Sequence, residues 1–161
     1  MHLVAAHGDE ALAARLAQID PANAAKYNAN YAAFSTKWKA ALARWAQRAA
    51  PLRGQPIVVQ HQNWVYLESW LGMKRVTALE PKPGVPPSAG YLANVLATLK
   101  RTPARMVIRS AYEDPRASTF IAQRAGIPAV VLPYTIGGTP GAKDLYSLYD
   151  DTITRLLAGL K

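Results

Sequence analysis

From Pro51 to the end of the chain, short runs rich in β-branched residues alternate with longer amphipathic stretches. Hairpin turns are too short to span the intervals between these runs, so the pattern is typical of parallel strands connected by helices. The predicted strands are residues 56–60, 75–79, 105–109 and 129–132, and the predicted helices are residues 64–71, 89–99, 115–125 and 144–160. We therefore predict an α/β fold: a three-layer lobe with a four-stranded parallel sheet flanked by helices.

The first 50 residues have a different, purely helical pattern. Apolar residues recur at helical spacing over residues 1–19, and this segment ends before the pair Asp20-Pro21. A second helix is predicted with Asp20 as its N-cap and Pro21 at its first position, and no residue interrupts it before Pro51. We therefore expect two parts, a helical segment over 1–50 and an α/β lobe over 51–161.

Composition limits the chemistry that the chain can perform. There is no cysteine, so a metal site must use His, Asp or Glu. The net charge is +9, but the basic residues are spread along the sequence, so we expect no nucleic-acid partner. No apolar run is long enough to cross a membrane, and the start MHLVAAHGDE lacks the basic and apolar regions of a signal peptide.

Polar side chains follow each of the four predicted strands. In an open parallel sheet, ligands bind outside the carboxyl ends of the strands, so these positions are the candidate site residues. They are His61, Glu80, Arg109 with Ser110, and Tyr134 with Thr135.

His61 and Glu80 are the candidates with ligand chemistry. His61 can act as a metal ligand or a general base, or it can simply cap the helix that follows. Glu80 can supply an oxygen ligand, or it can pair with Lys74, Lys82 or Arg109.

Other patterns give weaker indications. His2 and His7 are five residues apart, about 140° around a helix, and cannot bind one ion together. The loop between Gly137 and Asp144 lacks the second glycine and the hydroxyl residue of a phosphate-binding loop. We expect this loop to be a structured connection, with Asp144 capping the last helix.

Five segments together point to a known family. They are IDPANAAKYNANYAAF, VVQHQNWVYLESWLG, LEPKPGVPPSAGYL, YEDPRASTFIAQRAGIPAVVLP and GGTPGAKDLYSLYDDTI. In these segments the chain resembles the carboxyl-terminal half of the periplasmic solute-binding proteins of zinc and manganese ABC transporters, the cluster 9 or cluster A-I family. The resemblance implies two α/β lobes joined by one long rigid helix, with a metal ion held between them.

The same resemblance assigns parts of this chain. Residues 1–50 would include the linker helix, residues 51–161 would be the carboxyl-terminal metal-binding lobe, and the amino-terminal lobe with its ligands would lie before Met1. His61 matches the family's third ligand. Tyr134 or Thr135 stands where the family commonly has an acidic fourth ligand, so Glu80 or water would fill that place. We expect zinc, with manganese as the alternative, bound weakly by this chain alone.

The resemblance predicts a periplasmic metal-binding component of an ABC transporter that docks to a membrane permease and is not an enzyme. One alternative is a small α/β enzyme with His61 as general base, and another is a basic nucleic-acid-binding protein. With the amino-terminal lobe missing, we expect the inter-lobe face around His61, Trp64 and the Pro-rich loop 80–87 to be exposed. We expect a homodimer through that face, with Trp64 buried against its mate.

Overall fold

The computed structural model describes residues 2–161, and it describes side chains from Gly8 onward. The side chains of His2 and His7 therefore lie outside the described part of the chain. The structure divides into two compact units, Met1–Gln47 and Arg48–Lys161. Over the described residues, the helices are too short or too polar to span a bilayer.

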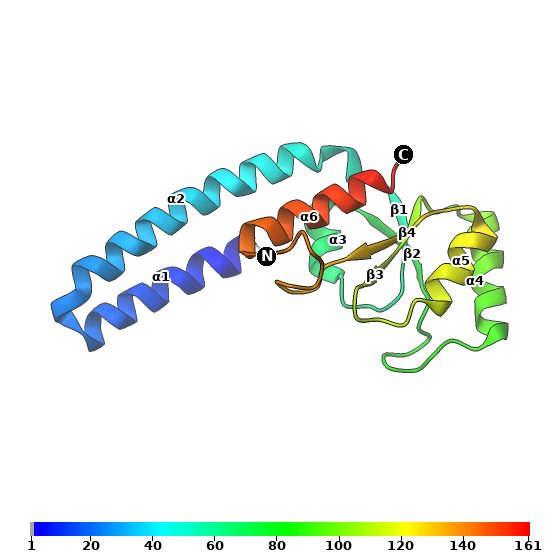
Figure 1. The fold of residues 1–161 in the computed structure, drawn as a ribbon, viewed down its shortest axis with the longest axis horizontal. Coiled ribbons are helices and arrows are strands. Elements are labelled where there is room, and N and C mark those ends of the chain that lie inside the picture. Colours follow the sequence, from blue (N-terminus) through cyan, green and yellow to red (C-terminus); the bar gives the residue numbers. More distant parts are fainter. Residues whose placement is uncertain (1) are drawn as a thin grey trace. The chain divides into compact units, whose positions relative to one another are not determined.

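The first unit is helical. Helices α1 (His2–Ile19) and α2 (Ala24–Arg48), the latter reaching one residue into the second unit, are joined by the short 3₁₀ helix η1 (Pro21–Asn23) and run side by side in opposite directions (Figure 1). As predicted, Asp20 stands at the N-cap with Pro21 in the first turn, but that turn is the 3₁₀ helix η1 and the Asp20 side chain makes no capping hydrogen bond. The Asp20 carboxylate accepts hydrogen bonds from Asn23 Nδ2 at 2.8 Å and Tyr27 Oη at 2.9 Å instead of from a helical N–H. These bonds, first from Asn23 and then from Tyr27, lower the pKa of Asp20.

The second unit follows the predicted alternation of strands and helices. Every predicted strand and helix is confirmed, with ends no more than two residues from the expected ones. In chain order the elements are η2 (Ala50–Leu52), β1 (Pro56–Val59), α3 (Val65–Leu71), β2 (Lys74–Ala78), α4 (Ala89–Arg101), β3 (Met106–Ser110), α5 (Arg116–Ala125), β4 (Ala129–Leu132) and α6 (Leu145–Ala158).

The four strands form one parallel sheet in the order β2-β1-β3-β4. Strand β1 is an interior strand, with Val58 paired to Val107 of β3 and to Thr77 of β2. Since all strands run the same way, their carboxyl ends form one edge of the sheet and their amino ends form the other. The α/β fold class is therefore confirmed.

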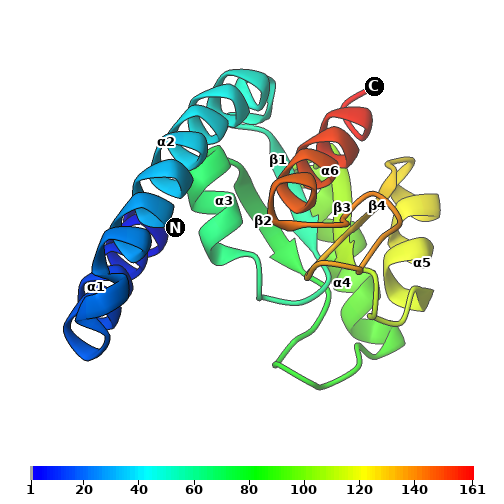
Figure 2. The ribbon, with the colours of Figure 1, turned by 60° about the vertical axis from the view of Figure 1, so that its left-hand side comes forward.

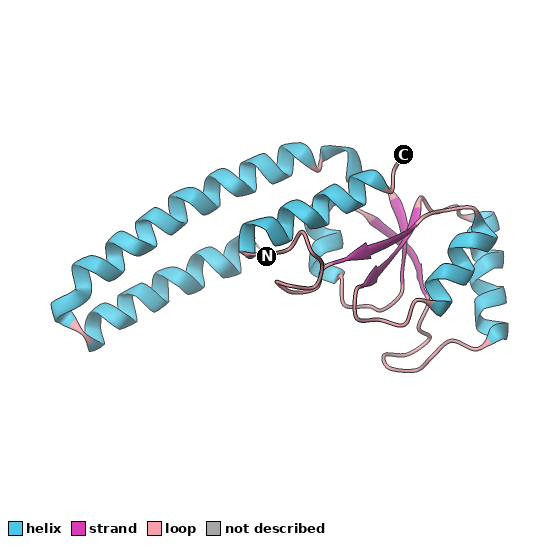
Figure 3. Cartoon of the chain, viewed as in Figure 1, coloured by secondary structure: helices cyan, strands magenta, loops and turns pink. Residues whose placement is uncertain are grey.

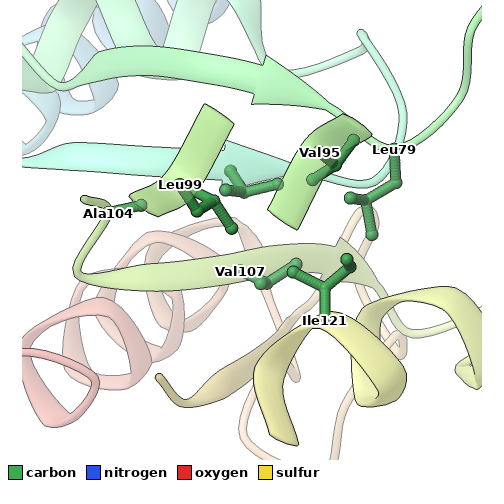
Figure 4. Packing of buried hydrophobic residues seen from close by; sticks show 7 residues of the cluster. Leu79, Val95, Leu99, Ala104, Val107 and Ile121 are labelled. Atoms are coloured by element: carbon green, nitrogen blue, oxygen red, sulfur yellow. The ribbon is translucent and has the colours of Figure 1, made fainter. Parts of the chain in front are cut away.

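Helices cover both faces of the sheet and give the three predicted layers. Helices α4 and α5 lie on one face, and α3 and α6 lie on the other (Figures 2 and 3). Figure 4 shows the core beneath α4 and α5, where Val95 and Leu99 of α4 and Ile121 of α5 meet the strand residues Val58 and Val107. Apolar burial of this kind supplies most of the driving force for folding.

Local sequence signals decide where the helices begin and how α6 ends. The Ser88 side chain accepts from Tyr91 N at 3.2 Å and caps α4. Asp144 and Ser147 form a capping box at the start of α6, which confirms the predicted cap. At the other end of α6, a Cβ on Gly159 would come within 2.7 Å of Val130, so glycine lets α6 pack closely on β4.

Candidate metal site

The loops that leave the carboxyl ends of the strands bring the predicted site residues to one edge of the sheet. The loop after β1 supplies His61, the loop after β2 supplies Glu80, and the loop after β4 supplies Tyr134. The loop after β3 begins beyond Ser110, and β3 lies between β1 and β4 in the sheet order. Residues far apart in sequence thus share one rim because the sheet is parallel.

His61 and Glu80 are in direct contact. His61 Nδ1 lies 2.5 Å from Glu80 Oε2, and the two side chains are 30% and 19% exposed. The same carboxylate oxygen accepts a hydrogen bond from Gly84 N at 3.0 Å, and Gly84 has a φ of +77° that favours glycine. Glu80 therefore pairs with the other predicted site residue and with the Pro-rich loop, rather than with Lys74, Lys82 or Arg109.

This contact prepares the imidazole for coordination. A histidine that binds a metal through one ring nitrogen usually donates its other N–H to a carboxylate or carbonyl. With Nδ1 held by Glu80, the tautomer that leaves a lone pair on Nε2 is favoured. The arrangement can present Nε2 to a cation, or it can orient the ring as a general base.

Another carboxylate, that of Glu113, lies in the loop after β3. Glu113 Oε2 accepts from Ser110 N at 2.6 Å, and the side chain is partly buried. Burial raises the pKa of Glu113 and the nearby Glu80 raises it further, against the lowering effects of the hydrogen bond from Ser110, of His61 and of Arg109. Sequence reasoning missed Glu113 because it considered only the positions directly after the strand. An acidic residue elsewhere in the same rim loop is the signal that would have found it.

An aromatic cluster of Trp64, Tyr112 and Tyr134 joins the loops that follow β1, β3 and β4 at the same rim. Tyr134 packs edge-on against both Trp64 and Tyr112, with ring centroids 5.6 Å apart in each pair. The expectation that Trp64 is exposed is wrong, since it is only 6% exposed. Tyr134, 47% exposed, and Tyr112, 67% exposed, are the aromatic rings at this surface. Trp64 is buried because the loop after β4 places the Tyr134 ring against it.

Several buried polar atoms near His61 lack hydrogen-bond partners among the described residues. They are Gln60 Oε1, Asn63 Oδ1 and Trp64 Nε1. The amide nitrogens of the first two side chains do have partners, because Gln60 Nε2 donates to Asp114 O at 2.8 Å and Asn63 Nδ2 donates to Tyr112 Oη at 3.1 Å. Buried polar atoms are ordinarily paired, so this part of the rim has unused capacity for polar ligands or water.

The remaining candidates have structural roles. Arg109 Nη1 donates to Ser110 O at 3.1 Å and to Glu113 O at 3.2 Å, and so holds the loop after β3. Ser110 is fully buried. Thr135 O accepts from Gly138 N at 3.0 Å within the loop that leads to α6.

In the loop between β4 and α6, backbone N–H groups donate to carbonyl groups of the same loop. Gly137 N donates to Ala142 O at 2.6 Å, and Ala142 N donates to Thr139 O at 3.1 Å. A phosphate-binding loop needs such N–H groups to point at its ligand. The loop is therefore a structured connection, as the sequence indicated.

Within residues 8–161, whose side chains the structure describes, there is no group of three or more His, Asp or Glu side chains close enough to hold one metal ion. The resemblance predicts an acid at Tyr134 or Thr135, and the observed contacts of Tyr134 are aromatic. The ligand chemistry that the described residues bring together is thus the imidazole of His61 and the carboxylate of Glu80.

Among curated proteins, the chain is similar to proteins of zinc uptake systems. The high-affinity zinc uptake system protein ZnuA of Brucella abortus is 27% identical over 105 residues, which are 65% of this chain and 31% of that protein. The protein of the same name from Brucella melitensis matches with the same identity and coverage. The matched part of the chain thus spans about a third of the length of these relatives.

Solved structures share the fold over most of the chain. A crystal structure of ZnuA matches with a TM-score of 0.75 and 25% identity, covering 93% of this chain and 56% of that one. FpvC from Pseudomonas aeruginosa, solved in complex with Mn²⁺, matches with a TM-score of 0.66 and 20% identity, covering 92% and 55%, and so supports the fold alone. The family model of ZnuA, the periplasmic component A of the zinc-uptake complex, matches residues 5–159, and the chain belongs to this family.

Proposed function

We propose that this chain is a metal-binding component of an ABC transporter and that it captures zinc as cargo at the carboxyl edge of its sheet. The observation that supports this most is the contact between His61 and Glu80, in a chain of the ZnuA family. Residues 1–50 would then include the linker helix, and residues 51–161 would be the metal-binding lobe. The periplasm as the site of action and a membrane permease as the partner belong to the same proposal.

His61 is the primary ligand in this proposal. Its Nε2 would coordinate the ion while Glu80 holds Nδ1 and keeps the ring oriented. Glu80 Oε1 can also approach the ion directly, because both recorded hydrogen bonds of the carboxylate use Oε2. Nitrogen and oxygen ligands without sulfur suit zinc and also admit manganese.

By the resemblance, Tyr134 or Thr135 occupies the place of the family's acidic ligand, and we take Tyr134 as that residue. A neutral phenol is a poorer ligand for a divalent cation than a carboxylate, since it contributes no negative charge at neutral pH. Water held by the unpartnered atoms Gln60 Oε1 and Asn63 Oδ1 would complete the coordination in part. We therefore expect zinc to bind this chain weakly, and we propose capture without chemical turnover.

The general-base alternative uses the same two residues, because a carboxylate that holds Nδ1 also orients a catalytic imidazole. Zinc titration by calorimetry distinguishes the two. Capture predicts one zinc per chain, competition by manganese, and no effect of magnesium, which prefers oxygen ligands. Zinc binding absent from the intact chain, or unchanged when His61 is replaced, would refute the proposal.

A further inference from the structure

The amino edge of the sheet in the second unit is lined with cations. Seven exposed basic residues lie where strands begin or where the helices that return from the far edge end: Arg53, Lys74, Lys100, Arg101, Arg105, Arg124 and Lys161. Figure 1 shows that α4, α5 and α6 all end at this edge, near the carboxyl terminus. A parallel sheet brings these helix ends together in the same way as it assembles the site at the opposite edge.

Backbone contacts tie the cationic segments to one another. Lys74 N donates to Gln55 O at 2.9 Å, and Arg105 N donates to Pro56 O at 2.8 Å, so both positions flank the start of β1. The Arg105 guanidinium donates to Leu160 O at 3.1 Å, which places it beside the end of α6. The cations therefore form one surface, which we call the basic edge, and not a scatter of unrelated charges.

Acidic residues are absent from the basic edge. Within residues 48–161, Glu80, Glu113, Asp114 and Asp144 lie in the rim loops at the carboxyl edge. Each of the others is paired with a cation outside the set above: Glu68 of α3 with Arg75 of β2, Asp150 of α6 with Arg48, and Asp151 with Arg155 within α6. No basic-edge residue takes part in a salt bridge among residues 8–161. The unit thus separates its charge, with positive side chains opposite the candidate metal site.

We propose that the basic edge binds anionic phospholipid headgroups and holds the chain at a membrane surface with the rim of His61 and Glu80 directed away from the lipid. Long basic side chains on separate segments suit a plane of negative charge. Each Lys or Arg near such a surface strengthens the partitioning of the chain onto the membrane about fivefold. The described large apolar side chains that are exposed include none at the loops of this edge, so the association is electrostatic and reversible.

A membrane fits this edge better than a nucleic acid does. Proteins that bind single strands combine cations with aromatic stacking platforms, and the exposed tyrosines of this unit, Tyr66, Tyr112 and Tyr134, lie in α3 or in rim loops away from the basic edge. The family is periplasmic and so acts beside a bilayer.

Vesicle co-sedimentation tests the proposal with the intact chain. The vesicles are phosphatidylcholine alone or phosphatidylcholine mixed with phosphatidylglycerol. The edge variant replaces Arg53, Lys74, Arg101 and Arg124 with Gln, which leaves Arg105 and its bond to Leu160 intact. A matched control replaces the exposed residues Lys26, Lys39, Lys82 and Lys143 with Gln, so that both variants have the same net charge.

We expect the chain to bind only the vesicles that contain phosphatidylglycerol, with binding weakened by added salt. The edge variant should partition at least about 100-fold more weakly, while the control should lose no more than about fivefold. Absence of binding to the anionic vesicles, equal losses in the two variants, or tighter binding to a random-sequence DNA duplex than to vesicles would each overturn the proposal. The edge variant should bind zinc like the unsubstituted chain, so this proposal and the proposed function fail separately.

Discussion

One oxygen of Glu80 joins His61 to the Pro-rich loop, since Oε2 lies 2.5 Å from His61 Nδ1 and 3.0 Å from Gly84 N. The imidazole at the end of β1 is therefore held by the segment that follows β2. Movement of that loop would change the direction in which Nε2 points. The zinc affinity of the chain should accordingly depend on both residues, but to different degrees.

Replacement of His61 by Ala should remove most of the site-specific zinc binding, a loss of at least about tenfold, because the only imidazole described at the rim is deleted. Calorimetric titration with zinc measures this loss of affinity. His2→Ala and His7→Ala serve as controls and should change the affinity little, because a spacing of five residues on a helix, about 140°, does not let two histidines bind one ion. Equal losses in all three variants would mean nonspecific surface binding.

The Glu80→Gln variant should weaken zinc binding by about tenfold, the usual effect of removing the partner that orients a ligand. Gln keeps the size of the side chain but lacks the charge. The same titration distinguishes two roles for Glu80. A loss as large as that of His61→Ala would identify Glu80 as a direct ligand, and no loss would remove it from the site.

Introduction of an acid at position 134 should strengthen zinc binding. Tyr134→Asp places a carboxylate where the resemblance predicts one, and we expect a gain of at least about tenfold from the added anionic ligand. Tyr134→Phe is the control, because it keeps the ring contacts with Trp64 and Tyr112 and removes only the hydroxyl. If Asp and Phe give the same affinity, the loop after β4 does not reach the ion.

Asp151 should contribute stability that is lost in acid. Burial acts to raise the pKa of Asp151, but hydrogen bonds from Thr139 and Arg155 and the charge of Arg155 outweigh it and lower the pKa below its ordinary value of 3.8. The stabilisation is then complete above 3.8 and is lost as the pH falls through the folded-state pKa.

Asp151→Asn should cost about 1–3 kcal/mol at neutral pH. Guanidinium unfolding at neutral pH and at a pH well below 3.8 checks this, with a smaller difference between the two proteins expected in acid. A difference that grows as the pH falls would contradict the assignment.

Self-association should involve the exposed tyrosines of the rim, Tyr112 and Tyr134. We still expect a homodimer through this face, but Trp64 cannot be its main contact because Tyr134 already covers it. Sedimentation velocity at several concentrations, with and without zinc, should detect a dimer that Tyr112→Ser weakens. A monomer under all these conditions would exclude the dimer and any zinc site shared by two copies of His61.

The sheet and its helices could be predicted because each element has its own local pattern, and the family resemblance read from the motifs is confirmed by the family match. His61 and Glu80 were found because each directly follows a strand. Their contact, across 19 residues, depends on the pairing of β1 with β2, which periodicity does not specify. Trp64 was placed wrongly for a similar reason, since the ring that covers it comes from the loop after β4.

The strand order also fixes when the parts of the rim come together during synthesis. Chains emerge from the ribosome amino terminus first, and β1, α3 and β2, which bring His61 to Glu80, are consecutive in the chain. Tyr134 follows β4, the last strand to be made, and β4 has a place to pair only after β3 has joined β1. Trp64 therefore reaches its buried environment at the end of folding, and its fluorescence would report the completed lobe.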